Sequence, residues 1–399
     1  MAIQKNIVEK IFPETLKILS DLIKFKTVSG TSNIELIEYC EKRLNSLGAT
    51  SFKTFDNTKL RVNLFSTIFG KKSKNDGSSG IVLSGHTDVV PASSKGWSSD
   101  PFVALEKNNK IYGRGSCDMK GFIACTLALA PYFSEQNLKK PIHFSYTYDE
   151  ETACQGAPVM LKELKNRKID CSVCIIGEPT NMKATQAHKG CYEYSTHFTG
   201  LAGHGSAPDR GVNAVEYATK FINKLMELRG ELKKRVPKNS VFTPPYTTLQ
   251  IGRIKGGIAR NVIADQCVVD WELRPVVFED GVFVNKVMDD YVKNILLPDM
   301  QKIYPKSEIK KEIIGEVVGF NKEENSEAVN MMCNLTGDNS KNVVSFGTEA
   351  GLFQEMGIST VVCGPGSIEQ AHKIDEYISI DQLKLCLKML IDLKENLSS

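Results

Sequence analysis

Four short apolar runs, separated by helical patterns, constrain the fold of this chain more than any other feature of the sequence. The apolar runs cover residues 81–84, 142–147, 173–176 and 360–363. Helical patterns lie between and after them, at 119–133, 156–166 and 381–396. Such alternation is typical of an α/β fold. We therefore expect an α/β domain in which a mixed sheet is flanked by helices.

A different pattern occupies the middle of the chain. Strand-like pieces at 191–199, 247–253 and 265–273 surround helical patterns near 212–229 and 284–296. A chain of 399 residues is also long for one compact core. We therefore expect an inserted α+β domain at 190–311, with the first domain formed by residues 1–189 and 312–399.

Charge and composition limit the classes of partner. The 50 basic and 47 acidic residues leave a net charge of only +3, so neither nucleic acid nor an anionic membrane is an expected partner. Residues 1–25 carry scattered charges, which argues against a signal peptide, and no later run is apolar enough to cross a bilayer. Eleven cysteines without a secretion signal favour a reducing compartment. We expect a cytoplasmic protein.

Histidine and carboxylate side chains follow the apolar runs at the point where each run ends. One further carboxylate opens the helical pattern at 119–133. In open α/β sheets, ligands bind outside the carboxyl ends of the strands, so these side chains should meet at one edge of the sheet. The side chains concerned are His86, Asp88, Asp118, Glu150, Glu151, Glu178 and His372.

This set of side chains predicts a metal site. Imidazole and carboxylate groups are ligands of divalent transition metals, above all zinc. One ion does not need so many carboxylates, whereas two ions about 3.5–4 Å apart can share one and leave another as a base. A single acid at a strand end also serves as a turn or cap residue, but five segments that reach one edge favour a two-metal site. Asp88 would then hold the imidazole of His86.

Several short motifs occur in a fixed order along the chain. They are Gly-His-Thr-Asp-Val-Val-Pro at 85–91, Gly-Arg-Gly-Ser-Cys-Asp-Met-Lys-Gly at 113–121, Asp-Glu-Glu at 149–151, Gly-Glu-Pro at 177–179, Gly-His-Gly-Ser-Ala-Pro at 203–208 and Ala-His at 371–372. Together they resemble the metallopeptidase and deacylase family that includes acetylornithine deacetylase, succinyl-diaminopimelate desuccinylase and aminoacylase. The resemblance covers nearly the whole chain. It implies a catalytic α/β domain interrupted by a lid domain, and a homodimer formed through that lid.

The resemblance implies a ligand set for two divalent metal ions, zinc in the first place and cobalt as an alternative. Asp118 would bridge the two ions. His86 and Glu178 would complete the coordination of one ion, and Glu151 and His372 that of the other.

The same resemblance implies catalytic roles in a metal-dependent amidohydrolase. Glu150 would be the general base, Asp88 would orient His86, and His204 would reach the active site of the other subunit to stabilise the oxyanion. Metal coordination lowers the pKa of a bridging water towards ~7, which makes hydroxide available at neutral pH. Glu150 would take the proton of this water and pass it to the leaving amine.

The C-terminal third favours one branch of the family. Residues 345–353 and 363–377 resemble acetylornithine deacetylase more than the desuccinylase, which implies hydrolysis of N2-acetyl-L-ornithine to L-ornithine and acetate in arginine synthesis. Asn261 and Arg274 match substrate-contacting lid positions of the family, and arginine suits a planar carboxylate. Thr348 and Glu349 complete the expected substrate site. Glu349 either faces the distal ammonium or remains a solvated or supporting carboxylate.

Some alternatives stay open at this level. The chain could instead be a desuccinylase, a dipeptidase or another acyl-amino-acid hydrolase of the same family, and an inactive metal-binding scaffold is the alternative from a different class. The sequence does not distinguish zinc, cobalt and manganese. It also leaves the roles of His188, His197 and Cys117 undecided.

Overall fold

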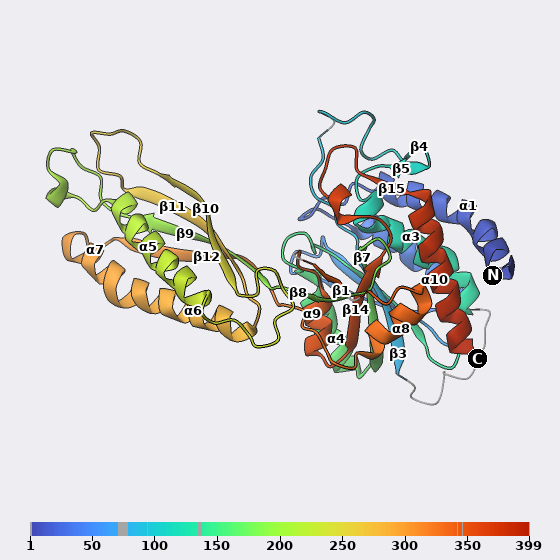
Figure 1. Ribbon diagram of the computed structural model, residues 1–399. Coiled ribbons are helices and arrows are strands. Elements are labelled where there is room, and N and C mark those ends of the chain that lie inside the picture. Colours follow the sequence, from blue (N-terminus) through green and yellow to red (C-terminus); the bar gives the residue numbers. More distant parts are fainter. Residues whose placement is uncertain are drawn as a thin grey trace. The chain divides into compact units, whose positions relative to one another are not determined.

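The computed structural model describes residues 2–70, 79–93, 95–134, 138–340, 342–344 and 346–398, which form two compact units (Figure 1). The first unit comprises Met1–Gln186, Lys322–Asn342 and Thr348–Ser399, and the second comprises Ala187–Asn321 and Val343–Gly347. Ser345, the first residue of one of the motifs, lies outside the described residues.

An eight-stranded mixed sheet forms the centre of the first unit, with strand order β1-β2-β6-β3-β7-β14-β8-β13. The strands are β1 (Thr50–Phe55), β2 (Val62–Ile68), β3 (Gly80–His86), β6 (Ile142–Thr147), β7 (Cys171–Pro179), β8 (Thr185–His188), β13 (Asn342–Val344) and β14 (Ser359–Gly364). The four strands β6, β3, β7 and β14 run parallel to one another, and every residue of β3 and β6 is buried. Parallel strands covered on both faces are buried along their whole length in this way, and the predicted α/β domain with a mixed sheet is confirmed.

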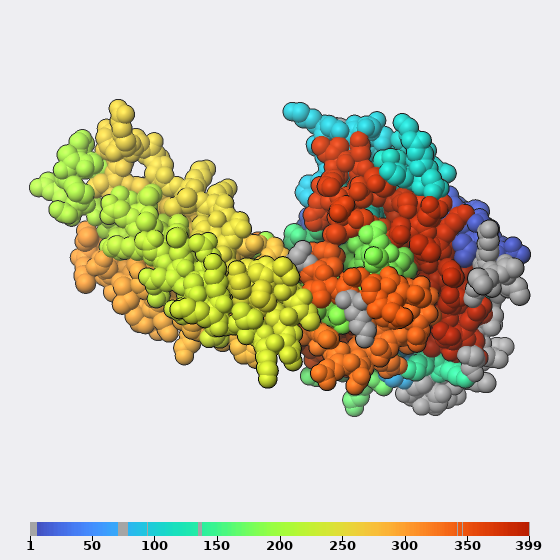
Figure 2. Space-filling view, viewed as in Figure 1, coloured from blue at the N-terminus to red at the C-terminus, as the bar shows by residue number. Residues whose placement is uncertain are grey.

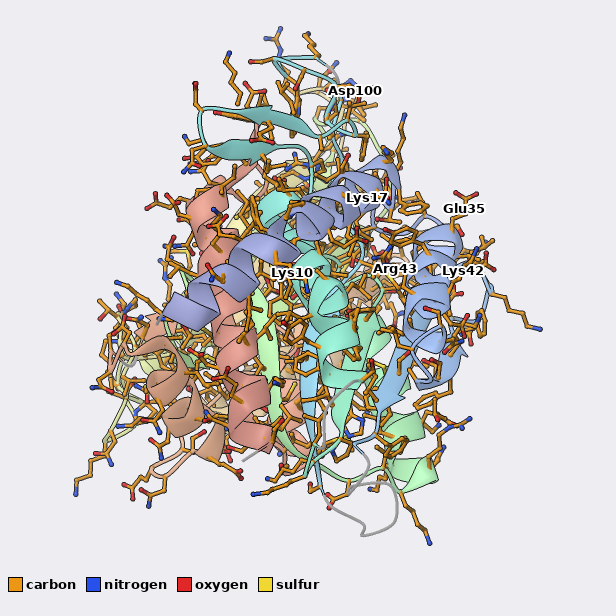
Figure 3. All side chains as sticks on the ribbon, turned by 90° about the vertical axis from the view of Figure 1, so that its right-hand side faces the viewer. Lys10, Lys17, Glu35, Lys42, Arg43 and Asp100 are labelled. Carbon is orange, nitrogen blue, oxygen red and sulfur yellow. The ribbon has the colours of Figure 1, made fainter. Side chains whose placement is uncertain are left out.

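Helices cover both faces of this sheet. One face packs against α1 (Ala2–Lys24), α2 (Ile34–Asn45), α3 (Gly121–Ser134), α8 (Glu327–Thr336) and α10 (Ile380–Ser398), which share a core with Leu83 and Phe144. The opposite face carries α4 (Gly156–Arg167) and α9 (Ala350–Glu355). In the space-filling view, α8 and α10 form much of the visible surface of the first unit, in orange and red (Figure 2). The outer surfaces of α1 and α2 are charged, with exposed Lys10 and Lys17 on α1 and Glu35 and Lys42 on α2 (Figure 3).

A small antiparallel sheet of order β15-β5-β4 lies in the same unit. It consists of β4 (Leu105–Lys107), β5 (Lys110–Tyr112) and β15 (Tyr377–Ser379). Tyr377 pairs with Tyr112, so the residues just before β15 lie beside the residues just after β5. The short helical turns of this unit are η1 (Ser116–Lys120), directly before α3, and η4 (Ile368–Gln370).

The second unit is an antiparallel sheet with helices on one face. Its strands, in the order β10-β11-β9-β12, are β9 (Cys191–Thr199), β10 (Thr248–Gly256), β11 (Gln266–Arg274) and β12 (Glu308–Val317). Burial alternates along β9 and β11, as it does in strands with one face on a core. The helices are η2 (Pro208–Arg210), α5 (Ala214–Leu232), α6 (Phe278–Tyr291), η3 (Val292–Leu296) and α7 (Leu297–Ile303).

The second unit extends beyond the boundary expected at residue 311. β12 pairs with β9 from Glu308 to Val317, so the chain leaves this unit only after Asn321. β12 is an edge strand whose residues are mostly exposed or half-buried. Its sequence therefore lacks the buried apolar run that identified the other strands. Among the described residues, no helix combines the length and the apolarity that a membrane crossing requires.

Candidate metal centre

The histidine and carboxylate residues selected from the sequence gather at the carboxyl edge of the parallel strands, within the first unit. They come from five separate segments of the chain. His86 ends β3, Glu178 lies near the end of β7, Glu150 and Glu151 follow β6, Asp118 lies in η1 before α3, and His372 follows η4. Parallel strands end at the same edge of a sheet, and this edge brings together residues far apart in sequence.

The carboxylate of Asp118 lies between the two histidines. Its Oδ1 is 3.0 Å from His86 Nε2, and its Oδ2 is 3.5 Å from His372 Nε2. A second carboxylate accompanies each imidazole: Glu178 Oε1 is 3.7 Å from His86 Nε2, and Glu151 Oε2 is 2.8 Å from His372 Nε2. The side chains therefore form two groups that share Asp118.

These donor atoms lie close enough together to hold a divalent cation. The donors of His86, Glu150 and Glu178 lie within 4.8 Å of one another, and so do those of His86, Asp118 and Glu151. His86, Asp118 and Glu178 are at most 6% exposed. Carboxylates buried this deeply need counter-charges, and a nitrogen and oxygen donor set fits zinc and related ions.

The electrostatics of the cluster also favour bound cations. Burial raises the pKa values of the Glu150 and Glu178 carboxyl groups well above their usual range, and neighbouring carboxylates raise them further. Burial also opposes ionisation of Asp118, but hydrogen bonds from the two histidines outweigh it and hold its pKa below its usual range. Hydrogen bonds to Asp118 and Glu151 raise the pKa of His372 to about 10. The metal-free cluster thus retains protons where cations would otherwise neutralise the carboxylates.

Asp88 supports two parts of this cluster. The Nδ1–H group of His86 donates to the Asp88 carbonyl oxygen at 2.9 Å, with the carboxylate Oδ1 at 3.5 Å. With a cation bound in place of the Nε2 proton, this bond would keep the Nδ1 proton in place and turn Nε2 towards the cation. The Asp88 carboxylate in turn accepts the backbone N–H groups of Glu150 at 3.0 Å and Glu151 at 3.3 Å. Asp88 therefore holds the segment that carries Glu150 and Glu151 as well as the imidazole.

Two residues that were not predicted from the sequence, Cys154 and Glu376, also contact the cluster. Cys154 Sγ lies 3.5 Å from Glu150 Oε1, in a tight turn where the Cys154 N–H donates to the Glu150 carbonyl. Glu376 accepts the N–H of Asp118 at 3.1 Å. Glu376 lies in the motif 363–377, so a signal for it was present, whereas no pattern marked Cys154.

Thr348 and Glu349 are buried in the first unit, which also contains the histidine and carboxylate cluster. The Thr348 hydroxyl accepts the N–H of Ala350 at 3.0 Å. Glu349 is 1% exposed and its Oε2 accepts the Ser84 hydroxyl at 3.4 Å. Burial raises the pKa of Glu349 to about 7. This position excludes a solvated carboxylate.

His204 and Asn261 lie side by side in the second unit. The N–H of Gly205 donates to the Asn261 carbonyl at 2.8 Å. The His204 side chain is exposed, and its Nδ1 accepts the N–H of Ser206 at 3.2 Å. A neutral imidazole that accepts at Nδ1 carries its proton on Nε2, so His204 presents a hydrogen-bond donor.

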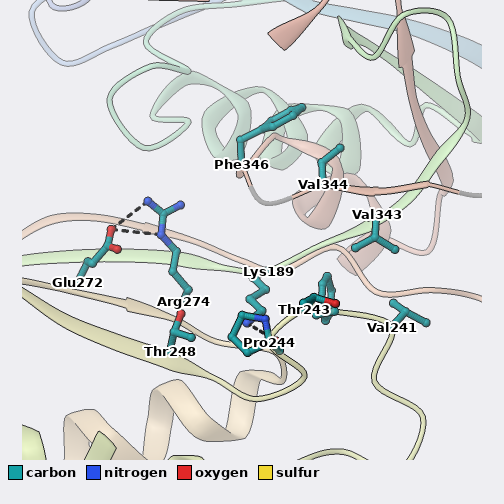
Figure 4. Close-up of a pocket in the computed structure, with 11 residues that line it drawn as sticks. Lys189, Val241, Thr243, Pro244, Thr248, Glu272, Arg274, Val343, Val344 and Phe346 are labelled. Carbon is teal, nitrogen blue, oxygen red and sulfur yellow. Dashed lines mark hydrogen bonds and ion pairs between the residues drawn. The ribbon is translucent and has the colours of Figure 1, made fainter. Parts of the chain in front are cut away.

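Arg274 lies in a cavity of about 670 Å³ in the second unit (Figure 4). Its Nη2 and Nε groups bond to Glu272 Oε2 at 2.9 and 3.2 Å. The cavity combines this ion pair with apolar walls. Its other lining residues are Lys189, Val241, Phe242, Thr243, Pro244, Thr248, Val343, Val344 and Phe346.

The three residues left undecided have local contacts that account for them. His188 is buried, packs against Phe320 and donates from Nδ1 to the Lys189 carbonyl at 2.9 Å. His197 pairs with Glu312 across β9 and β12 at 2.9 Å. Cys117 is buried, with Sγ 3.4 Å from the Ser367 carbonyl.

Comparison with known proteins agrees with the motifs. The profile described as peptidase family M20/M25/M40 matches residues 82–396. An acetylornithine deacetylase of Pectobacterium atrosepticum is 37% identical over 309 residues, which cover 77% of this chain and 78% of that protein. One from Pasteurella multocida is 33% identical over 392 residues, covering 96% and 98% respectively.

Solved structures show the same fold at lower sequence identity. A tripeptidase from Staphylococcus aureus has a TM-score of 0.72 at 20% identity, covering 97% of this chain and 98% of that one. An M20 family metallo-carboxypeptidase from Sulfolobus solfataricus has a TM-score of 0.73 at 19% identity, covering 96% and 98%. The family matches, together with a cluster of side chains that could hold a metal ion, confirm the resemblance carried by the motifs. The chain therefore belongs to peptidase family M20/M25/M40 and is a metal-dependent hydrolase.

Proposed function

We propose that this hydrolase removes the acetyl group of N2-acetyl-L-ornithine, releasing L-ornithine and acetate in the cytoplasm for arginine synthesis. The position of Asp118 is the observation that carries the proposal, because its two oxygens face different histidines in one cluster of histidine and carboxylate side chains. Acetylornithine deacetylases that match up to 96% of the chain support the choice of substrate.

Two divalent ions, zinc or alternatively cobalt, are the proposed cofactors. Asp118 would be shared between the ions, with His86 and Glu178 on one and Glu151 and His372 on the other. When bound, such a pair activates a water molecule and polarises the scissile carbonyl group.

Glu150 is the proposed proton carrier of the reaction. The oxygen of the attacking water forms a bond to the acyl carbon, the carbon–nitrogen bond breaks, and Glu150 transfers the proton of the water to the leaving nitrogen. Its segment is held for this purpose, since its backbone N–H bonds to Asp88 at 3.0 Å and the Cys154 thiol lies 3.5 Å from its carboxylate.

His204 is the proposed oxyanion donor, acting in the site of a second copy of the chain. Its exposed side chain and its protonated Nε2 suit donation to a developing negative charge. The proposal therefore includes a homodimer formed through the second unit.

The proposed substrate contacts are Arg274 and Asn261 of the second unit. Arg274 and Asn261 would bind the α-carboxylate, because a guanidinium group forms paired hydrogen bonds with a planar carboxylate. In the free protein the guanidinium group of Arg274 forms an ion pair with Glu272. The substrate carboxylate would take the place of Glu272 in this pair. The buried position of Glu349 suits a carboxylate that supports Glu150, alongside Thr348, better than a direct contact with the distal ammonium.

The proposal is tested by amine release from the purified, zinc- or cobalt-loaded protein. N-acetyl-L-ornithine is compared with N-succinyl-L,L-diaminopimelate, a dipeptide and acetylated neutral amino acids. Preference for acetylornithine supports the proposal. Preference for another substrate retains the metal chemistry and replaces the substrate assignment, and absence of hydrolysis with metal bound indicates an inactive scaffold.

A further inference from the structure

Glu376 is a buried carboxylate that binds the segment leading to Asp118. It is 1% exposed. Its Oε1 accepts the backbone N–H groups of Cys117 at 2.9 Å and Asp118 at 3.1 Å. Its Oε2 accepts the N–H of Gly115 at 2.9 Å and Nη1 of Arg114 at 2.8 Å. Both oxygens are thus occupied by donors from residues 114–118.

The fold brings this carboxylate to the segment from a distant part of the chain. Glu376 directly precedes β15, which pairs with β5, and the N–H of Gly113 donates to the Glu376 carbonyl at 3.0 Å. Residues 115–118 are not part of a β-strand, so no neighbouring strand accepts their buried N–H groups. These N–H groups need other acceptors. The Glu376 side chain supplies acceptors for three of them. Arg114, 4% exposed, balances its charge.

Glu376 also connects two parts of the metal centre. It lies four residues after His372, and it binds the N–H of Asp118, whose Oδ2 faces His372 Nε2 at 3.5 Å. A small rotation of the peptide at Asp118 would turn its carboxylate away from one of the two histidines. The hydrogen bonds to Glu376 restrict this rotation.

We propose that Glu376 is a positioning residue whose carboxylate fixes the backbone of residues 115–118, so that the two oxygens of Asp118 face the two metal sites. The proposal rests on the proposed two-metal function. Glu376 is not itself a ligand in this proposal, because four donors from residues 114–118 already occupy its two oxygens. It acts only through Asp118.

The test is the metal affinity of the Glu376→Gln variant, measured by competition with a chelator at a temperature well below unfolding. The amide has the same size but replaces one acceptor oxygen by a donor NH2 group, which faces N–H groups or Arg114 in either orientation. Loss of a partner that orients a ligand costs about 10- to 100-fold in metal affinity. We expect a loss of this size for zinc, together with a fall in kcat and little change in KM.

Asp280→Asn is the matched control for destabilisation. Asp280, in the second unit, is also 1% exposed and accepts from Arg235 at 2.7 Å and from Thr247 at 2.5 Å. This substitution removes a buried charge of the same kind from a site without metal ligands. It should lower the melting temperature while zinc affinity stays at the wild-type value.

The outcomes separate positioning from stability alone. If Glu376→Gln lowers zinc affinity no more than Asp280→Asn does, Glu376 only stabilises the fold and the proposal is overturned. If Glu376→Gln does not fold, Glu376→Asp retains the charge beside Arg114 with a shorter reach, and wild-type zinc affinity in that variant overturns the proposal equally. Wild-type protein that binds no zinc would refute the two-metal function itself, and with it the role of Glu376.

Discussion

Replacing Glu349 by glutamine should remove a pH-dependent loss of stability from the metal-free protein. Glu349 is 1% exposed, and burial raises its pKa from 4.5 to about 7. The folded state therefore binds this proton more tightly than the unfolded state does. The resulting stability is fully present below pH 4.5 and is lost as the pH rises through about 7. The difference corresponds to about 3 kcal/mol.

The assay is urea unfolding of metal-free wild type and Glu349→Gln at pH 4.5 and pH 8. Between these values the free energy of unfolding of the wild type should fall by about 3 kcal/mol more than that of the variant. Titratable groups that do not interact with Glu349 are present in both proteins and cancel in the comparison. Glu35→Gln changes an exposed glutamate of α2 and should leave the pH dependence as it is.

If the free energy of unfolding has the same pH dependence in wild type and Glu349→Gln, the reasoning is refuted. Glu349 would then have the same pKa in the folded state as in the unfolded chain. The same variant distinguishes its two proposed roles. A carboxylate that supports Glu150 affects kcat for every acyl amino acid. A carboxylate that binds the distal ammonium raises KM for acetylornithine and leaves acetylated neutral amino acids unchanged.

Three further substitutions test the proposed site. Glu150→Gln should keep both ions and lose about 10²- to 10⁴-fold in kcat; an equal loss of metal, measured by elemental analysis, would contradict its role as base. His372→Ala should lower the metal content from two ions per chain to one, whereas unchanged content would exclude His372 as a ligand. Arg274→Ala should raise KM more than it lowers kcat, and Arg274→Lys should not restore KM because lysine lacks the paired donors. Glu272→Gln removes the partner of Arg274 and is its control.

The catalytic edge could be predicted because parallel strands leave a strong sequence signal. β3 and β6 are buried along their whole length, so each contains a short apolar run, and charged residues follow where the strands end. The parallel arrangement then places those ends at one edge. His86 and Glu178 could be assigned to one cluster on this basis, and His86 Nε2 lies 3.7 Å from Glu178 Oε1.

Other features depend on long-range pairing that no local pattern records. β12 is an edge strand rich in exposed charge, so the sequence placed the boundary at 311 although the second unit continues to Asn321. The contact of Glu376 with Asp118 spans 258 residues and follows from the pairing of β15 with β5. The bonds from Asp88 to the N–H groups of Glu150 and Glu151 follow in the same way from strand register.

The acidic residues around the centre divide into two kinds according to what their oxygens contact. Asp88 and Glu376 accept backbone N–H groups of the segments that carry Glu150 and Asp118. Ser29 also donates to Asp88 and Arg114 to Glu376; the pKa of Asp88 is lowered, whereas burial still raises that of Glu376. The carboxylates on the inner side instead face imidazole nitrogens and one another, and burial raises the pKa values of several of them. The supporting carboxylates thus accept backbone hydrogen bonds, whereas the inner carboxylates repel one another. The electrostatic energy of the site is therefore lowest when cations lie between the inner carboxylates.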